Sequence, residues 1–290
     1  MIKHWIHAMR IRTLPAAGAP LILGGVLAYL DRGLHWGIML CAVVSALAIQ
    51  IGTNLANDYF DWKNGADTDL RVGPVRVTQA GLIPPNHVWW AMVGCFGIAA
   101  LAGSVLMVRC GWPIVGIGFV SIAMGILYTG GPRPLGYMGL GDLLVFLFFG
   151  PVATAGTYYV NLLQWNLTSV VLGAALGLIA TAIIGVNNLR DIIEDRTTGK
   201  TTLAVRFGAR FARWEYSFCM VGGCVLAGGW AISSGRGWSA VAAGLVGAAA
   251  IRLIRQIWTL DGRELDPLLG QTGRLLLALS LGLSLGWVLG

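Results

Sequence analysis

Two stretches of the chain repeat one pattern of amide and carboxylate residues, at Ile51–Asp61 and at Ile184–Glu194. Both copies fit Ile-Gly-x-Asn-x-x-x-Asp-x-x-Asp/Glu, and each closes a long apolar run. Positions i, i+4 and i+7 share one face of a helix, so each copy presents an amide and two carboxylates along one stripe. Carboxylates held this closely repel one another, and a bound cation would relieve that repulsion.

Further acids follow each copy, namely Asp67 and Asp69 after the first and Asp195 after the second. Two carboxylates about 5 Å apart repel by roughly 3 kcal/mol at an effective dielectric constant near 20. The four His and five Cys residues have no metal-ligand spacing, and oxygen ligands without them favour a hard cation such as Mg²⁺. Ordinary solvated charges in a loop explain one stripe alone equally well, whereas two matched stripes indicate a metal site.

Basic residues accompany both stripes. They are Lys63, Arg71 and Arg76 beside the first, and Arg190, Arg196 and Lys200 beside the second. Mg²⁺ commonly takes one or two carboxylates together with phosphate oxygens of a substrate. The pattern therefore predicts Mg²⁺ ions around one diphosphate group, which Lys and Arg help to neutralise as a leaving group.

The elements that position these stripes are membrane helices. Of the 290 residues, 56% are hydrophobic and only 11% are charged, against about 25% charged in soluble domains. Nine apolar stretches are long enough to cross a bilayer. They are 14–30, 37–57, 88–108, 112–129, 142–160, 169–188, 217–234, 238–258 and 272–290. The predicted fold is an all-α, nine-helix transmembrane bundle forming a single domain over 1–290.

Charge counting orients this bundle. With the N-terminus in the cytoplasm, 17 of the 20 Lys and Arg residues fall on the cytoplasmic side. The net charge of +7 then faces anionic lipid and gives no reason to expect nucleic acid. The two acidic stripes end the second and sixth spans, so both reach the cytoplasmic face, beside predicted cap loops at about 58–87 and 189–216.

The motifs resemble those of the UbiA superfamily of membrane prenyltransferases. The matching residues are Asn57-Asp58-x-x-Asp61-x5-Asp67 and Asp191-x-x-x-Asp195. The five-residue gap before Asp67 is similar to the gap in one branch of the superfamily, whose members prenylate 1,4-dihydroxy-2-naphthoate in menaquinone synthesis. The resemblance covers about residues 10–210. Further matching stretches are 12–17, 73–83, 128–142 and 187–204.

The resemblance implies a helical bundle with a central cavity and a Mg²⁺-dependent reaction at its cytoplasmic end. A polyprenyl diphosphate would donate its chain to 1,4-dihydroxy-2-naphthoate, with loss of CO₂ and diphosphate, giving demethylmenaquinol. The implied location is the inner membrane of a bacterium, with the lipid bilayer as surroundings. No obligate protein partner is evident.

The resemblance also assigns roles to residues. The expected Mg²⁺–diphosphate ligands are Asp58, Asp61, Asp67, Asp191 and Asp195, with Asn54 beside them. The expected substrate-binding residues are Asn54, Asn57, Lys63, Arg76, Asn187, Arg190 and Lys200. Tyr128 is expected to flank the allylic carbon, where an aromatic face stabilises cationic charge. Arg12 or Arg133 is expected to hold the carboxylate of the acceptor.

Two other interpretations of the sequence stay open at this point. An ion-coupled transporter also carries internal repeats and ionisable residues, although those usually lie near the middle of the membrane. A prenyltransferase of the same fold could use another aromatic acceptor, such as homogentisate or 4-hydroxybenzoate, because a fold does not determine its substrate. Mg²⁺-dependent consumption of a prenyl diphosphate separates the enzyme from the transporter.

Overall fold

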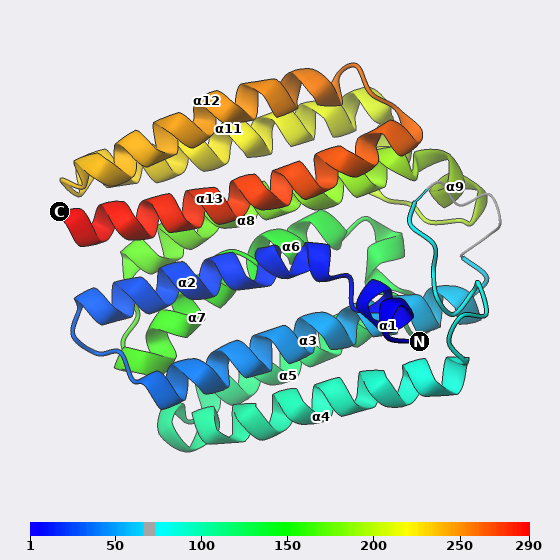
Figure 1. Cartoon of the computed structure of the whole chain (residues 1–290), viewed down its shortest axis with the longest axis horizontal. Coiled ribbons are helices and arrows are strands. Elements are labelled where there is room, and N and C mark those ends of the chain that lie inside the picture. Colours follow the sequence, from blue (N-terminus) through cyan, green and yellow to red (C-terminus); the bar gives the residue numbers. More distant parts are fainter. Residues whose placement is uncertain (67–72) are drawn as a thin grey trace.

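The computed structural model of the chain describes residues 1–66 and 73–290, and this part is built of helices that run along a common axis (Figure 1). The long elements are α2 (Leu14–Leu30), α3 (Trp36–Lys63), α4 (Pro85–Cys110), α5 (Trp112–Leu127), α8 (Leu167–Arg190), α11 (Ala209–Ser233), α12 (Gly237–Ile257) and α13 (Asp266–Leu289). The shorter helices are α1 (Ile2–Ala8), α6 (Gly141–Phe148), α7 (Pro151–Leu162), α9 (Ile192–Thr197) and α10 (Leu203–Phe207). The described residues contain no strand, as the predicted all-α class requires.

Seven helical segments in the described part are long and apolar enough to cross a membrane, with α6 and α7 counted together as one. Two further apolar helices are shorter, α2 with 17 residues and α5 with 16. These nine segments occupy the nine predicted stretches; seven of them have 21 to 28 residues, whereas α2 and α5 are shorter. The chain is thus an integral membrane protein.

Three helices extend six to eight residues beyond their predicted ends. The predicted second span stops at residue 57, whereas α3 continues to Lys63 and carries Asp58 and Asp61 in its last turns. Helix α11 begins at Ala209 and α13 at Asp266, both before the predicted starts at 217 and 272. Hydropathy locates the residue at which the side chains become polar. The helix itself continues for as long as its backbone N–H and C=O groups stay hydrogen-bonded, so it can end later.

The predicted fifth span is broken in its middle. Helix α6 ends at Phe148, and α7 begins with Pro151 in its first position, where proline needs no hydrogen-bond donor. Between them, Gly150 lies directly against α8. A Cβ atom on Gly150 would come within 2.7 Å of the Gly177 Cα and 2.5 Å of the Phe146 carbonyl oxygen. The bend therefore lets two backbones touch, as small residues do between membrane helices.

Replacing Gly150 by alanine should lower the free energy of unfolding by about 3 kcal/mol, because every close neighbour is a backbone atom that cannot rotate away. Thermal unfolding in detergent micelles measures this loss. Gly156→Ala in α7 is the matched control, since a Cβ there meets nothing within 4 Å. Equal melting temperatures for Gly150→Ala and the wild type would contradict the close packing.

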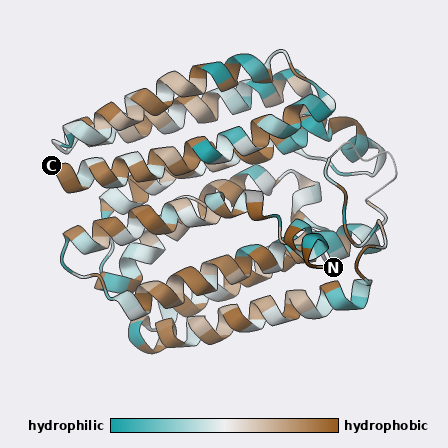
Figure 2. Cartoon of the chain, viewed as in Figure 1, coloured by the Kyte–Doolittle hydropathy of each residue, from teal (hydrophilic) through white to brown (hydrophobic). Residues whose placement is uncertain are grey.

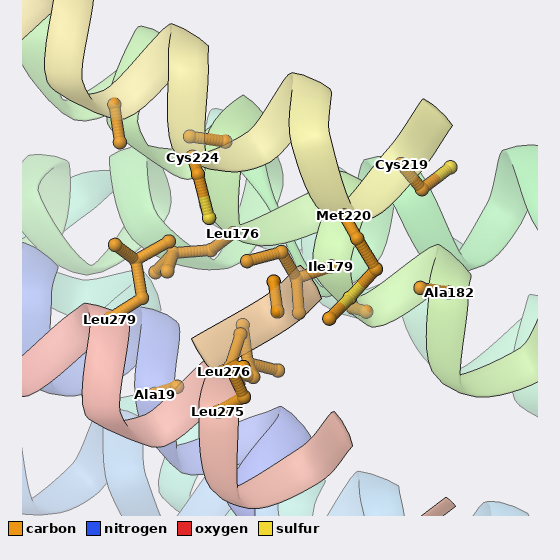
Figure 3. Packing of buried hydrophobic residues seen from close by; sticks show 14 of the residues in the cluster. Ala19, Leu176, Ile179, Ala182, Cys219, Met220, Cys224, Leu275, Leu276 and Leu279 are labelled. Atoms are coloured by element: carbon orange, nitrogen blue, oxygen red, sulfur yellow. The ribbon is translucent and has the colours of Figure 1, made fainter. Parts of the chain in front are cut away.

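The largest hydrophobic core surrounds α8, which is apolar on all sides and contacts α2, α6, α7, α11 and α13. Figure 3 shows Leu176 and Ile179 of α8 between Met220 of α11 and Leu276 of α13. Of the seven spans in the described part, α8 has the largest buried share, 67%, so it is the central helix of the bundle. Since α8 ends at the second acidic motif, this packing holds that motif rigidly.

The bundle closes by contact between elements far apart in the chain. Helix α13 packs along α2, and the Ser280 hydroxyl donates to the Ala19 carbonyl at 2.6 Å. Figure 2 shows apolar residues along the helices and hydrophilic residues gathered at the right-hand end, where α9, α1 and the end of α3 lie (Figures 1 and 2). Both acidic motifs belong to this polar end.

Candidate functional site

The first acidic motif is buried at the end of α3. Asp58 and Asp61 each expose only 2% of their surface. The Asp58 carboxylate accepts hydrogen bonds from the backbone N–H groups of Val77 and Thr78, at 3.3 Å and 3.0 Å. The segment after the motif thus folds back over the helix, and Asp58 holds it there.

Asp61 is surrounded by hydrogen-bond donors and positive charge. Arg76 forms an ion pair with one carboxylate oxygen at 2.8 Å, and the Tyr137 hydroxyl donates to the other at 2.7 Å. The Lys200 ammonium lies 3.6 Å from that second oxygen. Charge-assisted hydrogen bonds of this kind are stronger than those between neutral groups, and they fix the position of this buried carboxylate.

The two amides of the first motif contact neighbouring loops. Asn54 donates to the Met9 carbonyl at 3.0 Å and to the Thr13 hydroxyl at 3.2 Å, which ties α3 to the N-terminal segment. Asn57 accepts a hydrogen bond from the Thr129 hydroxyl at 3.0 Å, which ties α3 to the segment after α5. Both amides orient the walls of the site around the carboxylates.

The second acidic motif lies where α8 ends and α9 begins. Asp191 is the residue between the two helices, and Asp195 is buried within α9. Burial raises the pKa of Asp195 to about 7, and the nearby Asp191 carboxylate also raises it, while Lys200 lowers it. A cation that binds Asp195 must displace a proton near neutral pH, so such binding tightens as the pH rises through about 7.

Arg190 connects the second motif to the rest of the bundle. Its guanidinium donates twice to the Asp191 carboxylate, at 2.7 Å each, and once to Asn187 at 2.6 Å. A third nitrogen forms an ion pair with Asp266, the first residue of α13, at 2.8 Å. A Cβ atom on Gly73 would come within 2.6 Å of this guanidinium, so the segment after the first motif packs directly on it.

Lys200 brings the two motifs together. Its ammonium nitrogen lies 3.6 Å from Asp61 of the first motif and 3.9 Å from Asp195 of the second. It also lies 4.9 Å from the centre of the Tyr137 ring. Acids that are 134 residues apart in the sequence, Asp61 and Asp195, therefore flank one positive charge.

The other predicted site residues are more scattered. Tyr128 follows α5, and its ring leaves no room for a Cβ atom on Gly136 or Gly141. Lys63 and Arg133 are exposed and form no ion pair with the described residues. Asp67 and the side chain of Arg12 lie outside the described residues, so their predicted roles stay predictions.

Three residues at the site were not singled out from the sequence. Tyr137 bonds Asp61, Thr129 bonds Asn57, and Asp266 pairs with Arg190. Tyr137 and Thr129 fall in the stretch 128–142, and the resemblance of this stretch to the family could have identified them as site residues. Asp266 lies beyond the matching stretches, and its place at the start of an apolar helix was the one feature that could have drawn attention to it.

The oxygen atoms of the side chains at the site are suitable ligands for a hard cation, although they do not complete its coordination by themselves. Within 1–66 and 73–290, no three His, Cys, Asp or Glu side chains converge closely enough to hold a metal ion by themselves. The carboxylates offer only oxygen ligands, and burial together with neighbouring acids raises the pKa of Asp195. This arrangement fits Mg²⁺, which takes one or two carboxylates and completes its shell with phosphate oxygens and water.

Fold and site together define an all-helical membrane protein with paired acidic motifs at one end of the bundle. The chain belongs to the UbiA prenyltransferase family, whose family model matches residues 18–286. This finding confirms the resemblance seen in the motifs.

Particular relatives extend over nearly the whole chain. The 1,4-dihydroxy-2-naphthoate octaprenyltransferase of Mycobacterium tuberculosis is 38% identical over 97% of this chain and 95% of its own length. The protein of the same name from Haemophilus influenzae is 32% identical over 100% of this chain and 97% of its own length. A UbiA homolog from Archaeoglobus fulgidus bound to GPP and Mg²⁺ shares the fold, with a TM-score of 0.67, 14% identity and 98% coverage of both chains.

Proposed function

We propose that this protein transfers a polyprenyl chain from polyprenyl diphosphate to 1,4-dihydroxy-2-naphthoate. CO₂ and diphosphate are released, and the product is the demethylmenaquinol of menaquinone biosynthesis. The near-full-length similarity to two naphthoate octaprenyltransferases supports the acceptor. The meeting of both acidic motifs at Lys200 is the observation that carries the site.

Mg²⁺ is the proposed cofactor, held by carboxylates of the two motifs. The ligands would be Asp58, Asp61, Asp67, Asp191 and Asp195, with Asn54 beside them. When bound, Mg²⁺ neutralises the diphosphate and so makes it a better leaving group. A UbiA homolog from Archaeoglobus fulgidus has been solved bound to Mg²⁺ with DMAPP and with GPP, which supports this choice.

The chain's own residues would bind and orient the donor. Arg76 and Lys200 already lie within 3.6 Å of Asp61, so they are well placed to shift onto phosphate oxygens. Lys63 would contact the diphosphate from the exposed end of α3. Asn187 and Arg190 act at the second motif, where the contacts of Arg190 favour a role in fixing Asp191 over direct contact with the diphosphate.

The reaction would proceed by ionisation of the donor. The allylic C–O bond breaks and its electron pair leaves with the diphosphate. The ring carbon that bears the carboxylate attacks the allylic cation, and the C–C bond to the carboxylate then breaks, which releases CO₂ and restores the ring electrons. Tyr128 would stabilise the cation with its ring face, and Arg12 or Arg133 would hold the acceptor carboxylate. Apolar helices around the site keep water from the cation.

We also propose the topology of the protein. All nine apolar segments cross the membrane, with the bilayer thinned locally around the shorter α2 and α5, and the chain is one domain over 1–290. The N-terminus and the acidic motifs face the cytoplasm of a bacterium whose inner membrane holds the protein. The bias of Lys and Arg toward this side supports the orientation.

An assay with purified protein tests the proposed function. Protein in lipid nanodiscs receives 1,4-dihydroxy-2-naphthoate or 4-hydroxybenzoate with donors of several chain lengths, and CO₂ release and prenylated product are measured. We expect turnover only with the naphthoate and complete loss when EDTA removes Mg²⁺. Restored turnover after Mg²⁺ is added back is the control. Turnover with 4-hydroxybenzoate instead, or no consumption of prenyl diphosphate, would refute the assignment.

A further inference from the structure

A groove of about 400 Å³ lies between α12 and α13, away from the acidic motifs on α3, α8 and α9. Its lining consists of Ala249, Arg252, Leu253, Gln271, Arg274 and Leu275. Figure 2 shows hydrophilic positions on α12 and α13 toward the end of the bundle that carries α9 (Figures 1 and 2). The groove thus combines apolar walls with two guanidinium groups on facing helices.

The two arginines of the groove have no anionic partner among the described residues. Within residues 1–66 and 73–290, neither Arg252 nor Arg274 forms an ion pair or a hydrogen bond. Other arginines of the bundle are held, for example Arg190 by Asp191 and Arg213 by Asp261, at 2.7 Å each. Two like charges lining one groove repel each other, and an anion between them would remove that repulsion.

The depth of these residues places both arginines near the membrane interface. Arg274 follows the first residue of α13 by eight positions, which is about 12 Å along the helix axis. Arg252 precedes the end of α12 by five positions, or about 7.5 Å. Both side chains are exposed on the outside of membrane helices, where an unpaired charge is costly and reaches toward lipid headgroups.

We propose that this groove binds the phosphate group of an anionic phospholipid. The two guanidinium groups would bind the phosphate, Gln271 would contribute a further polar contact, and the acyl chains would lie on Ala249, Leu253 and Leu275. Basic pockets between membrane helices favour such headgroups. A soluble diphosphate is the less suitable ligand, because the groove opens on the lipid-facing surface of spans and its other walls are apolar.

Native mass spectrometry of the full-length protein tests this proposal. The wild-type protein in neutral detergent is titrated with phosphatidylglycerol and, separately, with phosphatidylcholine of the same chain length. We expect at least one phosphatidylglycerol to stay bound, and the variant Arg252→Gln/Arg274→Gln to bind it about 30-fold more weakly. Equal retention of the two lipids by the wild type would overturn the proposal without any variant.

A matched control separates the groove from general charge. Arg210→Gln/Arg263→Gln removes two exposed positive charges near the same end of the bundle, outside the groove. We expect this variant to bind phosphatidylglycerol within about threefold of the wild type. An equal loss in both double variants would show non-specific attraction and overturn the site. Displacement of the lipid by millimolar inorganic diphosphate would also overturn it, in favour of a soluble anion.

Discussion

Replacing Asp191 by asparagine should reduce the rate of prenyl transfer at least about a thousandfold while the protein still inserts and folds. The substitution removes a negative charge from the proposed metal site and keeps the shape of the side chain. Loss of one preorganised electrostatic group typically costs about 10²–10³ in rate, and loss of a metal ligand adds to this. The measurements are kcat at saturating substrate and the Mg²⁺ concentration that gives half-maximal rate, which should rise.

Asp266→Asn is the matched control for this experiment. Asp266 is the other carboxylate that Arg190 binds, at 2.8 Å, and it lies at the start of α13. If Asp191 serves the metal, Asp266→Asn should lower activity less than about tenfold, with unchanged Mg²⁺ dependence. Equal losses from both substitutions would mean that Asp191 acts only as an anchor for Arg190.

Replacing Lys200 by methionine should lower kcat/KM for the prenyl diphosphate at least about a hundredfold. Methionine keeps much of the side-chain length but removes the charge that lies between Asp61 and Asp195. The two buried carboxylates would then face each other with less compensation, and the diphosphate would lose a cationic contact worth about 2–3 kcal/mol. Steady-state kinetics with varied donor concentration measure the effect.

Lys3→Met is the control for lost lysine charge, because Lys3 is exposed on α1 and forms no ion pair in the described part of the chain. It should leave kcat/KM within about twofold. If Lys200→Met behaved like Lys3→Met, the two motifs would not share a functional charge. The proposal of one site built from both motifs would then fail.

Most of the helical architecture was predictable from hydropathy. Seven of the nine predicted stretches correspond to segments long enough to cross a membrane, because such a segment needs about 20 apolar residues and leaves a strong signal, whereas α2 and α5 are shorter. The break at Gly150 was not predicted, although Pro151 is visible in the sequence. The break depends on a close approach to Gly177 on α8, and such contacts between distant segments leave no local pattern.

The two acidic motifs were predictable, but their partners were only partly so. Spacing along one helix explains why Asp58 and Asp61 share a buried face. The ion pair between Arg76 and Asp61 was not deduced, since Arg76 was expected to contact substrate. The bond from Tyr137 depends on how a loop folds over the end of α3, and residue types alone do not determine that.

The contact between α2 and α13 has a consequence for biosynthesis. Ser280 of α13 bonds the backbone of Ala19 in α2, and Asp266 at the start of α13 pairs with Arg190. A nascent chain inserts its helices one after another, so α2 can pack on α7 and α8 as they emerge, whereas its contact with α13 forms last. Arg190 has Asp191 and Asn187 as partners as soon as α8 is complete, but gains Asp266 only when α13 arrives. The bundle around the second acidic motif is therefore complete only after the last helix of the chain has been made.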